Sequence, residues 1–179
     1  MTGFRQLDET VVYEGAVVTL AQGRFLTPDG DTVERDCLRH PGAVSVVALR
    51  GDNVVMVRQY RAAIDQVLLE IPAGKRDVAD EAPDVTANRE LMEEVGYRAS
   101  SLTLLSSFYN SAGFCDELSF VYLAEDLEPV PTDLQGVEEQ HMTIVEVPLD
   151  SVPDLIASGE LCDAKSIIGC LLALRHRGR

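Results

Sequence analysis

Two runs of mainly β-branched residues, AVSVVALR (43–50) and VVMVRQY (54–60), are joined by the turn sequence Gly51-Asp52-Asn53. Apolar, β-branched runs on either side of such a turn are typical of a β-hairpin. A hairpin at this position restricts the chain to folds that contain a sheet, around which the other elements have to be arranged. We therefore predict that the chain folds around a β-sheet.

The rest of the sequence contains further strand patterns and a few helix patterns. Short strands are predicted within 11–40, where a turn at 28–31 separates them. Further strands are predicted over 67–72, 102–109, 118–127 and 142–149. Helices are predicted over about 84–95, 151–158 and 164–176. This order is neither a regular βαβ alternation nor an all-β pattern, so it predicts a mixed α/β domain.

Composition limits the classes of protein to which the chain can belong. The 179 residues are 46% hydrophobic and 25% charged, which suits one globular domain, or one with a small appendage. The net charge of −15 argues against a nucleic-acid-binding protein. The apolar runs are too short to cross a membrane and the N-terminus lacks a secretory signal pattern, so we expect a cytoplasmic protein. The four cysteines have no metal-binding spacing.

The segment RELMEEVG (89–96) brings three glutamates together: Glu90, Glu93 and Glu94. On a helix with about 100° per residue they fall on one face. Like charges at this spacing destabilise an isolated helix by about 0.2–0.5 kcal/mol per pair. The opposite, core-facing side is predicted to consist of Val85, Leu91, Met92 and Val95. The glutamates are therefore either a solvated acidic face or a site for a hard divalent cation such as Mg²⁺ or Mn²⁺.

A wider pattern surrounds this helix. Six residues separate Gly74 from Glu81, and seven residues separate Glu81 from the segment RELMEEVGY (89–97). This pattern closely resembles the signature of the Nudix hydrolase family, Gly-x5-Glu-x7-Arg-Glu-U-x-Glu-Glu-x-Gly-U, in which U is an apolar residue. One extra residue lies between Gly74 and Glu81, in the loop before the helix, so the spacing within the helix is unchanged.

The resemblance extends over about residues 40–175, because the segments LEIPAG, VRQYR, NSAGFCDE and DAKSIIG are similar to the ADP-ribose pyrophosphatase branch of that family. It implies an α/β fold, a Nudix-type α/β/α sandwich with a mixed sheet, preceded by a small N-terminal antiparallel sheet. We therefore expect N-terminal antiparallel strands over 1–41, which would contribute to a homodimer, and a Nudix hydrolase domain over 42–179.

The resemblance also implies the roles of the signature residues. Glu90 and Glu94 are the leading candidates for binding a divalent metal, Mg²⁺ or alternatively Mn²⁺. Glu93 is a third candidate, as a metal ligand or as a catalytic residue. The backbone carbonyl of Ala73 is expected to join them, and Arg89 to orient a signature glutamate. Hydrolysis of a pyrophosphate needs such a metal to neutralise the phosphates and activate water.

Residues outside the helix are assigned to proton transfer and to substrate binding. In the branch that the chain resembles, the general base is a glutamate on a loop before the last strand, which here is Glu138, with Glu139 as the alternative. Arg61 matches a substrate-binding arginine, and Arg35 is a second candidate that would act across a dimer interface. Glu70 either contacts substrate or forms an ion pair at the end of its strand.

The activity that the resemblance implies is Mg²⁺-dependent hydrolysis of the pyrophosphate bond of ADP-ribose or a related nucleoside diphosphate sugar, which gives a nucleoside monophosphate and a sugar phosphate. Ala112 stands where this branch usually has a proline, so other substrates such as GDP-mannose or NADH stay open. A non-catalytic binding module is a further alternative, but such modules typically lack a signature glutamate and this chain keeps them. The expected partner is a small molecule, not a nucleic acid or a membrane.

Overall fold

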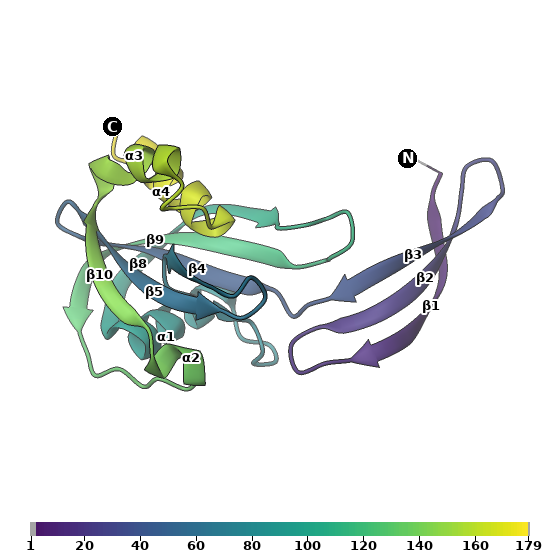
Figure 1. Cartoon of the computed structure of the whole chain (residues 1–179), viewed down its shortest axis with the longest axis horizontal. Helices are drawn as coiled ribbons and strands as arrows, with labels where there is room; N and C mark the ends of the chain where they lie inside the picture. Colours follow the sequence, from purple (N-terminus) through teal and green to yellow (C-terminus); the bar gives the residue numbers. More distant parts are fainter. Residues whose placement is uncertain (1–2, 179) are drawn as a thin grey trace. The chain divides into compact units, whose positions relative to one another are not determined.

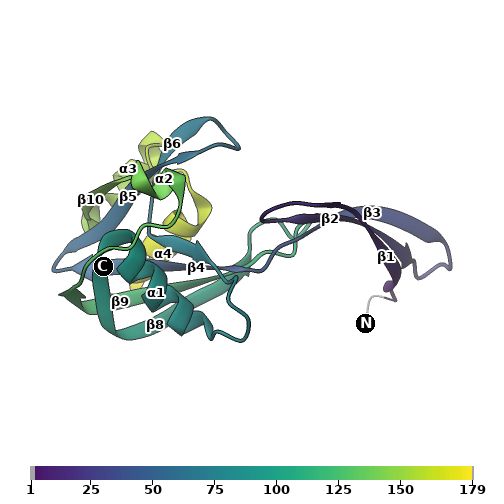
Figure 2. The same cartoon turned by 90° about the horizontal axis from the view of Figure 1, so that it is seen from below.

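The computed structural model describes residues 3–178, which form two compact units (Figures 1 and 2). The first unit contains the residues up to Gly42 together with Phe108–Leu118, and the second contains Ala43–Ser107 and the residues from Ser119 onward. Phe108–Leu118 therefore belongs with the N-terminal strands rather than with the sequence that flanks it. Backbone hydrogen bonds account for this grouping, because the Leu38 N–H donates to the Phe114 carbonyl (2.7 Å).

The first unit is a three-stranded antiparallel sheet in the order β1-β2-β3. Its strands are β1 (Arg5–Glu14), β2 (Thr19–Leu26) and β3 (Thr32–Arg39). The turn predicted at 28–31 is confirmed: the Thr27 N–H donates to the Asp31 carbonyl (2.8 Å) and Gly30 has a φ of 91°. Every residue of β1 is exposed within the chain.

The second unit is built on a seven-stranded mixed sheet. Its strands are β4 (Ala43–Arg50), β5 (Asn53–Arg61), β6 (Gln66–Glu70), β7 (Ala73–Lys75), β8 (Tyr97–Tyr109), β9 (Leu118–Pro129) and β10 (Thr143–Pro148). The order is β10-β5-β4-β9-β8, with β6 paired to β5 and β7 paired to β4. Strands β4 and β9 are parallel, whereas β4 and β5 form the predicted antiparallel hairpin.

Helices cover both faces of this sheet. Besides α1 (Pro83–Val95) they are α2 (Val137–Gln140), the 3₁₀ turn η1 (Leu149–Ser151), α3 (Val152–Ser158) and α4 (Ala164–His176). Neighbouring side chains of a strand point to opposite faces. Val46 belongs to the core cluster with Leu91 of α1, whereas Val47 packs beside Gly169 of α4. Figure 1 accordingly shows α1 and α4 on opposite sides of the strands, which confirms the predicted α/β/α sandwich with a mixed sheet.

Several elements differ from the sequence prediction, among them α2, for which no helix was predicted, and the strands β7 and β8. Ala73–Lys75, expected to end a strand, forms the short strand β7 and pairs with β4. Three residues are too few to produce a periodic pattern, so the sequence did not indicate this strand. β8 begins at Tyr97 rather than at 102, directly after the helix. No helix within residues 3–178 is long and apolar enough to cross a membrane.

The predicted core face of α1 is partly wrong. Leu91 and Val95 are buried as expected, but Val85 is 53% exposed. Thr86, Ala87 and Glu94 are buried instead. The helix is thus rotated relative to the prediction, and the side that carries the glutamates is covered by other parts of the unit.

Candidate active site

The ends of α1 are defined by its sequence. Pro83 occupies the first turn, where its missing N–H costs no hydrogen bond, and Asp84 favours the positive end of the helix dipole. Gly96 ends the helix in the left-handed conformation with a φ of 70°, and its N–H bonds back to the carbonyls of Leu91 and Met92. These signals place the acidic residues in the last two turns of α1.

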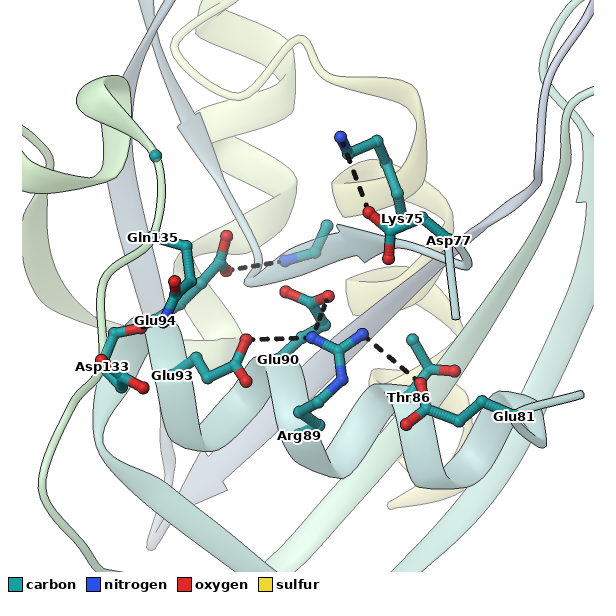
Figure 3. Close-up of polar contacts among 12 residues, drawn as sticks. Lys75, Asp77, Glu81, Thr86, Arg89, Glu90, Glu93, Glu94, Asp133 and Gln135 are labelled. Atoms are coloured by element: carbon teal, nitrogen blue, oxygen red, sulfur yellow. Dashed lines mark hydrogen bonds and ion pairs between the residues drawn. The ribbon is translucent and has the colours of Figure 1, made fainter. Parts of the chain in front are cut away.

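Arg89 lies at the centre of the acidic residues. Its Nη1 atom is 2.9 Å from a carboxylate oxygen of Glu90 and 2.9 Å from one of Glu93, and its Nη2 atom is 3.4 Å from one of Glu81 (Figure 3). Glu81 thus reaches the cluster in spite of the extra residue in the loop. All these side chains are less than one third exposed. An orienting role of Arg89, as the sequence predicts, would use these contacts.

Glu94 lies on the neighbouring side of the helix and is only 4% exposed. Its Oε2 atom accepts a hydrogen bond from the Ala73 N–H (2.9 Å), so α1 is joined to β7 at this point (Figure 3). Because β7 is itself paired with β4, the core of the sheet fixes the position of this carboxylate. Ala73, predicted to contribute a backbone carbonyl, is therefore adjacent to Glu94.

Gly74 allows the carboxylate of Glu90 to approach the backbone of β7. A methyl group built on Gly74 would overlap the Glu90 carboxylate, including both of its oxygens. The requirement for glycine at this position is therefore steric, and it explains why the signature begins with this residue.

Replacing Gly74 by alanine should displace Glu90 and lower kcat/KM by about tenfold to a hundredfold, since displacements near 1 Å at a reacting centre cost about that much. The measurement is steady-state kinetics together with thermal unfolding. Val85→Ala is a suitable control because it shortens a side chain on the same helix that is 53% exposed. An activity of Gly74→Ala equal to that of the unchanged protein would contradict the proposed position of Glu90.

Two of the glutamates have strongly raised pKa values. Burial raises the pKa of Glu94 to about 8, although its hydrogen bond to Ala73 acts in the opposite direction. Burial likewise raises the pKa of Glu90 to about 7, opposed by the charge of Arg89. Burial thus outweighs the Ala73 hydrogen bond at Glu94 and the charge of Arg89 at Glu90, and an additional cation would stabilise the ionised forms of both glutamates.

The donor set of this site suits a hard divalent cation. Carboxylates without imidazole or thiolate ligands are typical of magnesium and manganese sites. Within residues 3–178, however, no three His, Cys, Asp or Glu side chains are arranged as a ready coordination shell. Glu90 and Glu93 are turned toward Arg89, so holding a metal would require them to exchange part of this contact for the cation.

The two candidates for the general base lie on α2. Glu139 accepts hydrogen bonds from the backbone N–H groups of Gln135 (2.8 Å) and Gly136 (3.0 Å). After burial, which is the largest cause, the charge of Glu139 adds to the raised pKa of both Glu90 and Glu94. The charge of Glu138, in contrast, affects Tyr60. Of these two candidates, Glu139 is thus the one whose charge acts on the signature glutamates.

Arg61 and Glu70 form a bidentate ion pair. Arg61 Nε and Nη2 donate to the two carboxylate oxygens of Glu70 at 2.7 and 2.6 Å. Glu70 is 1% exposed, and Lys165 of α4 contacts the same carboxylate. The ion pair that the sequence left open for Glu70 is thus present. Arg61 is also close enough to Glu94 for its charge to lower the pKa of that glutamate, against the larger effect of burial.

Arg35 belongs to the first unit, where it lies on β3 and donates from Nη1 to the Glu34 carbonyl (2.7 Å). It lines a pocket of about 350 Å³ within that unit. Ala112 and Phe114 of the NSAGFCDE segment line the same pocket, as do Phe25 and Tyr109. Aromatic walls and a basic residue are features suited to a nucleotide.

Sequence reasoning assigned no role to the start of α4. Asp163 caps this helix by accepting from the Ser166 N–H (3.0 Å), and Lys165 reaches back to Glu70. The available signal was an aspartate directly before a helix pattern, which indicates a cap. It did not indicate the contact of Lys165, because Glu70 is 95 residues away in sequence.

Comparison with known proteins gives a consistent result. The model of the NUDIX domain matches residues 39–167. An ADP-ribose pyrophosphatase of Bacillus subtilis (strain 168) is 38% identical over 87% of this chain and 84% of its own length. A methanol dehydrogenase activator of Bacillus methanolicus is 37% identical over 93% and 92%. A solved structure described as an ADP compounds hydrolase shares the fold, with a TM-score of 0.84 at 24% identity over 98% of this chain and 96% of that one.

The match of the domain model covers most of the chain. It includes strands β6 and β7, all of α1, and α2, which carries Glu138 and Glu139. The relatives are similar over nearly the full length, and the structural match extends to both units. The signature spacing, the carboxylates gathered on α1 and these similarities lead to the same assignment. The chain belongs to the Nudix family.

Proposed function

We propose that this protein is a hydrolase that cleaves the pyrophosphate bond of ADP-ribose or a closely related nucleoside diphosphate sugar. The observation that carries the proposal is the group of buried or half-buried glutamates Glu90, Glu93 and Glu94 beside Arg89. The products from ADP-ribose would be AMP and ribose 5-phosphate. The name of the Bacillus subtilis relative supports the choice of substrate.

Glu90 and Glu94 would hold a divalent cation, with Glu93 and the carbonyl of Ala73 as further ligands. When bound, Mg²⁺ or Mn²⁺ would neutralise phosphate oxygens and activate water for attack. The raised pKa values of Glu90 and Glu94 support this role, because they reflect buried carboxylates whose ionised forms a cation would stabilise. Arg89 contacts both Glu90 and Glu93, and Glu90 lies against β7 at Gly74.

We infer that α2 supplies the general base. Glu139 is favoured by its electrostatic influence on Glu90 and Glu94. Its Oε2 atom is fixed by two backbone N–H groups, and the carboxylate keeps a second oxygen to accept a proton. Glu138, the first choice from sequence, is exposed and makes no side-chain hydrogen bond within the described residues, so it is the alternative.

Arg61 would bind a phosphate of the substrate. Its side chain is 40% exposed, and its bonds to Glu70 use Nε and Nη2, which leaves the Nη1 hydrogens for a ligand. A planar guanidinium that is fixed on one side is well suited to phosphate oxygens. Arg35, in the aromatic pocket of the first unit, is the second candidate for a contact with substrate.

The experiment that tests the proposed function is a panel of ADP-ribose, GDP-mannose, NADH and other nucleotide sugars, each with Mg²⁺, with products identified by mass. We expect ADP-ribose to be among the substrates with the highest kcat/KM. A preference for GDP-mannose or NADH would replace the substrate and keep the chemistry. Binding of ADP-ribose without turnover of any member would indicate a binding module.

A homodimer formed through the N-terminal strands, and a cytoplasmic location, are also proposed. The dimer is supported by apolar side chains that β1 leaves exposed: Val11 (58%), Val12 (62%) and Tyr13 (65%). Such a surface is typical of a region that another protein surface covers. Light scattering should give twice the chain mass of 19.6 kDa. The chain mass itself, at all concentrations, would contradict the dimer.

A further inference from the structure

A charged cluster in the second unit lies outside the signature. We call it the Glu70 cluster, and it consists of Arg61, Glu70, Asp163 and Lys165. Glu70 is almost fully buried, and burial alone would raise its pKa. The hydrogen bonds and charges of Arg61 and Lys165 outweigh burial and lower the pKa of Glu70. Two cations therefore share one buried carboxylate.

Lys165 holds the cluster to α4. Its Nζ atom contacts Glu70 and lies 3.0 Å from Oδ2 of Asp163, and its side chain is 15% exposed. Asp163 in turn accepts from both the backbone N–H (3.0 Å) and the hydroxyl (2.5 Å) of Ser166. Lys165 thus bridges a carboxylate that caps a helix and the carboxylate that binds Arg61.

The cluster adjoins the segment that positions the signature glutamates. Glu70 is followed by Ile71, whose N–H donates to the Ser166 hydroxyl (2.9 Å). Two residues further on, the Ala73 N–H donates to Glu94. Charges from both groups act on Arg61: its hydrogen bonds to Glu70 and, more weakly, the charges of Asp163 and Glu94 raise its pKa. The position and charge of Arg61 therefore depend on what else binds Glu70.

We propose that Lys165 is a positioning residue for the reaction: by sharing the Glu70 carboxylate, it keeps Arg61 fixed in orientation while leaving part of the arginine's positive charge available to a substrate phosphate. This inference rests on the proposed function. With Lys165, two cations balance the carboxylates of Glu70 and Asp163. Without it the Glu70 cluster carries a net negative charge, so Arg61 attracts an anion less strongly. Asp163 loses a counter-ion at the same time, but its hydrogen bonds to Ser166 remain.

Lys165→Met should raise the KM for ADP-ribose about tenfold and change kcat less than about twofold, because it weakens binding without altering groups at the reacting atoms. Isothermal titration with ADP-ribose in EDTA gives a second readout that does not depend on turnover, and Kd should rise by a similar factor. Lys165→Arg keeps the charge and should restore KM to within about threefold of the unchanged protein.

The decisive arm is a double-mutant cycle with Arg61→Ala. If Lys165 acts through Arg61, then adding Lys165→Met to Arg61→Ala should raise KM by less than about twofold. Removing one partner of a buried ion pair can destabilise a fold. If Lys165→Met does not fold, the same comparison is made in Glu70→Gln, where the buried carboxylate is neutral and Lys165→Met should again have no further effect on KM.

Two controls separate positioning from general structural effects. Ser166→Ala removes the link between α4 and Ile71 but leaves the contact of Lys165 with Glu70, so it should lower the melting temperature without the rise in KM. Arg58→Met removes a positive charge from the same strand as Arg61, where Arg58 pairs with Glu160 on the surface. Its KM should stay within about twofold.

The possible outcomes are distinct. A wild-type chain that neither binds nor hydrolyses ADP-ribose or another nucleotide sugar would overturn the proposed function, and the role of Lys165 with it. Wild-type hydrolysis with an unchanged KM and Kd in Lys165→Met would overturn only the role of Lys165. Equal effects of Lys165→Met in the presence and absence of Arg61 would also overturn it, since the lysine would then act independently.

Discussion

Glutamine in place of Glu94 should reduce turnover by about 100- to 1,000-fold, since a bound metal contributes several kcal/mol to stabilising charge in the transition state. Glu94 is the most buried of the signature glutamates, and the Ala73 N–H fixes one of its oxygens. Glutamine keeps an oxygen that can accept this hydrogen bond and removes the charge. The fold should therefore be retained, which circular dichroism and thermal unfolding can verify.

The pH dependence of metal binding provides a second readout. The pKa of Glu94 is raised to about 8, so the folded protein binds this proton more tightly than the unfolded chain does. Its contribution to stability is present at low pH and is lost as the pH rises through about 8. Mg²⁺ binds the ionised carboxylate. Mg²⁺ should therefore raise the melting temperature more at about pH 9 than at about pH 6, and Glu94→Gln should lose most of this increment.

Glu146→Gln is a matched control for this experiment. Glu146 lies on β10, is partly exposed and pairs with Arg50, away from α1. Its replacement should leave turnover within about twofold, since surface ion pairs contribute little. If Glu94→Gln retained the turnover of Glu146→Gln, Glu94 would have no role as a metal ligand.

Glu139→Gln should lower kcat by about 100- to 10,000-fold, which is the usual contribution of a general base. Metal binding should change little, because Glu139 is proposed to act on a proton and not as a ligand. The change in melting temperature on adding Mg²⁺ should therefore match that of the unchanged protein. This combination separates a base from a metal ligand, for which both quantities fall.

Glu138→Gln is the neighbouring variant against which this result is judged. Glu138 is exposed, and the group that its charge affects is Tyr60 rather than the signature glutamates. We expect its kcat to fall less than about threefold. The reverse result, a large loss in Glu138→Gln and a small one in Glu139→Gln, would restore the assignment that the sequence favoured. Similar kcat values in both variants and the unchanged protein would exclude α2 as the source of the base.

The elements that the sequence predicted well are those with strong local signals. The hairpin of β4 and β5 follows from β-branched runs and a polar turn, and α4 begins and ends where predicted. Asp163 before α4 and Gly96 after α1 are end signals that act within one helical turn. Such signals depend only on neighbouring residues, so they can be read without knowledge of the fold.

The burial of the glutamates could not be predicted in this way. Helical periodicity placed Glu94 opposite the core face, yet it is 4% exposed because β7 lies against it. Asp133, whose N–H bonds to the Glu93 carbonyl (3.1 Å), brings the segment before α2 to the same end of the helix. Contacts between distant segments, like that of Lys165 with Glu70, are set by the packing of the whole unit. The resemblance to a family identified the glutamates but not their surroundings.

Hydrolysis of ADP-ribose followed by phosphorus NMR tests the central claim most directly, with Mg²⁺ in one sample and EDTA in the other. With Mg²⁺, the paired signals of the diphosphate should be replaced by two phosphomonoester signals, which match AMP and ribose 5-phosphate. With EDTA the diphosphate signals should persist. Persistence of the diphosphate in both samples, for ADP-ribose and for the other nucleotide sugars of the panel, would contradict the assignment of this protein as a metal-dependent nucleotide-sugar hydrolase.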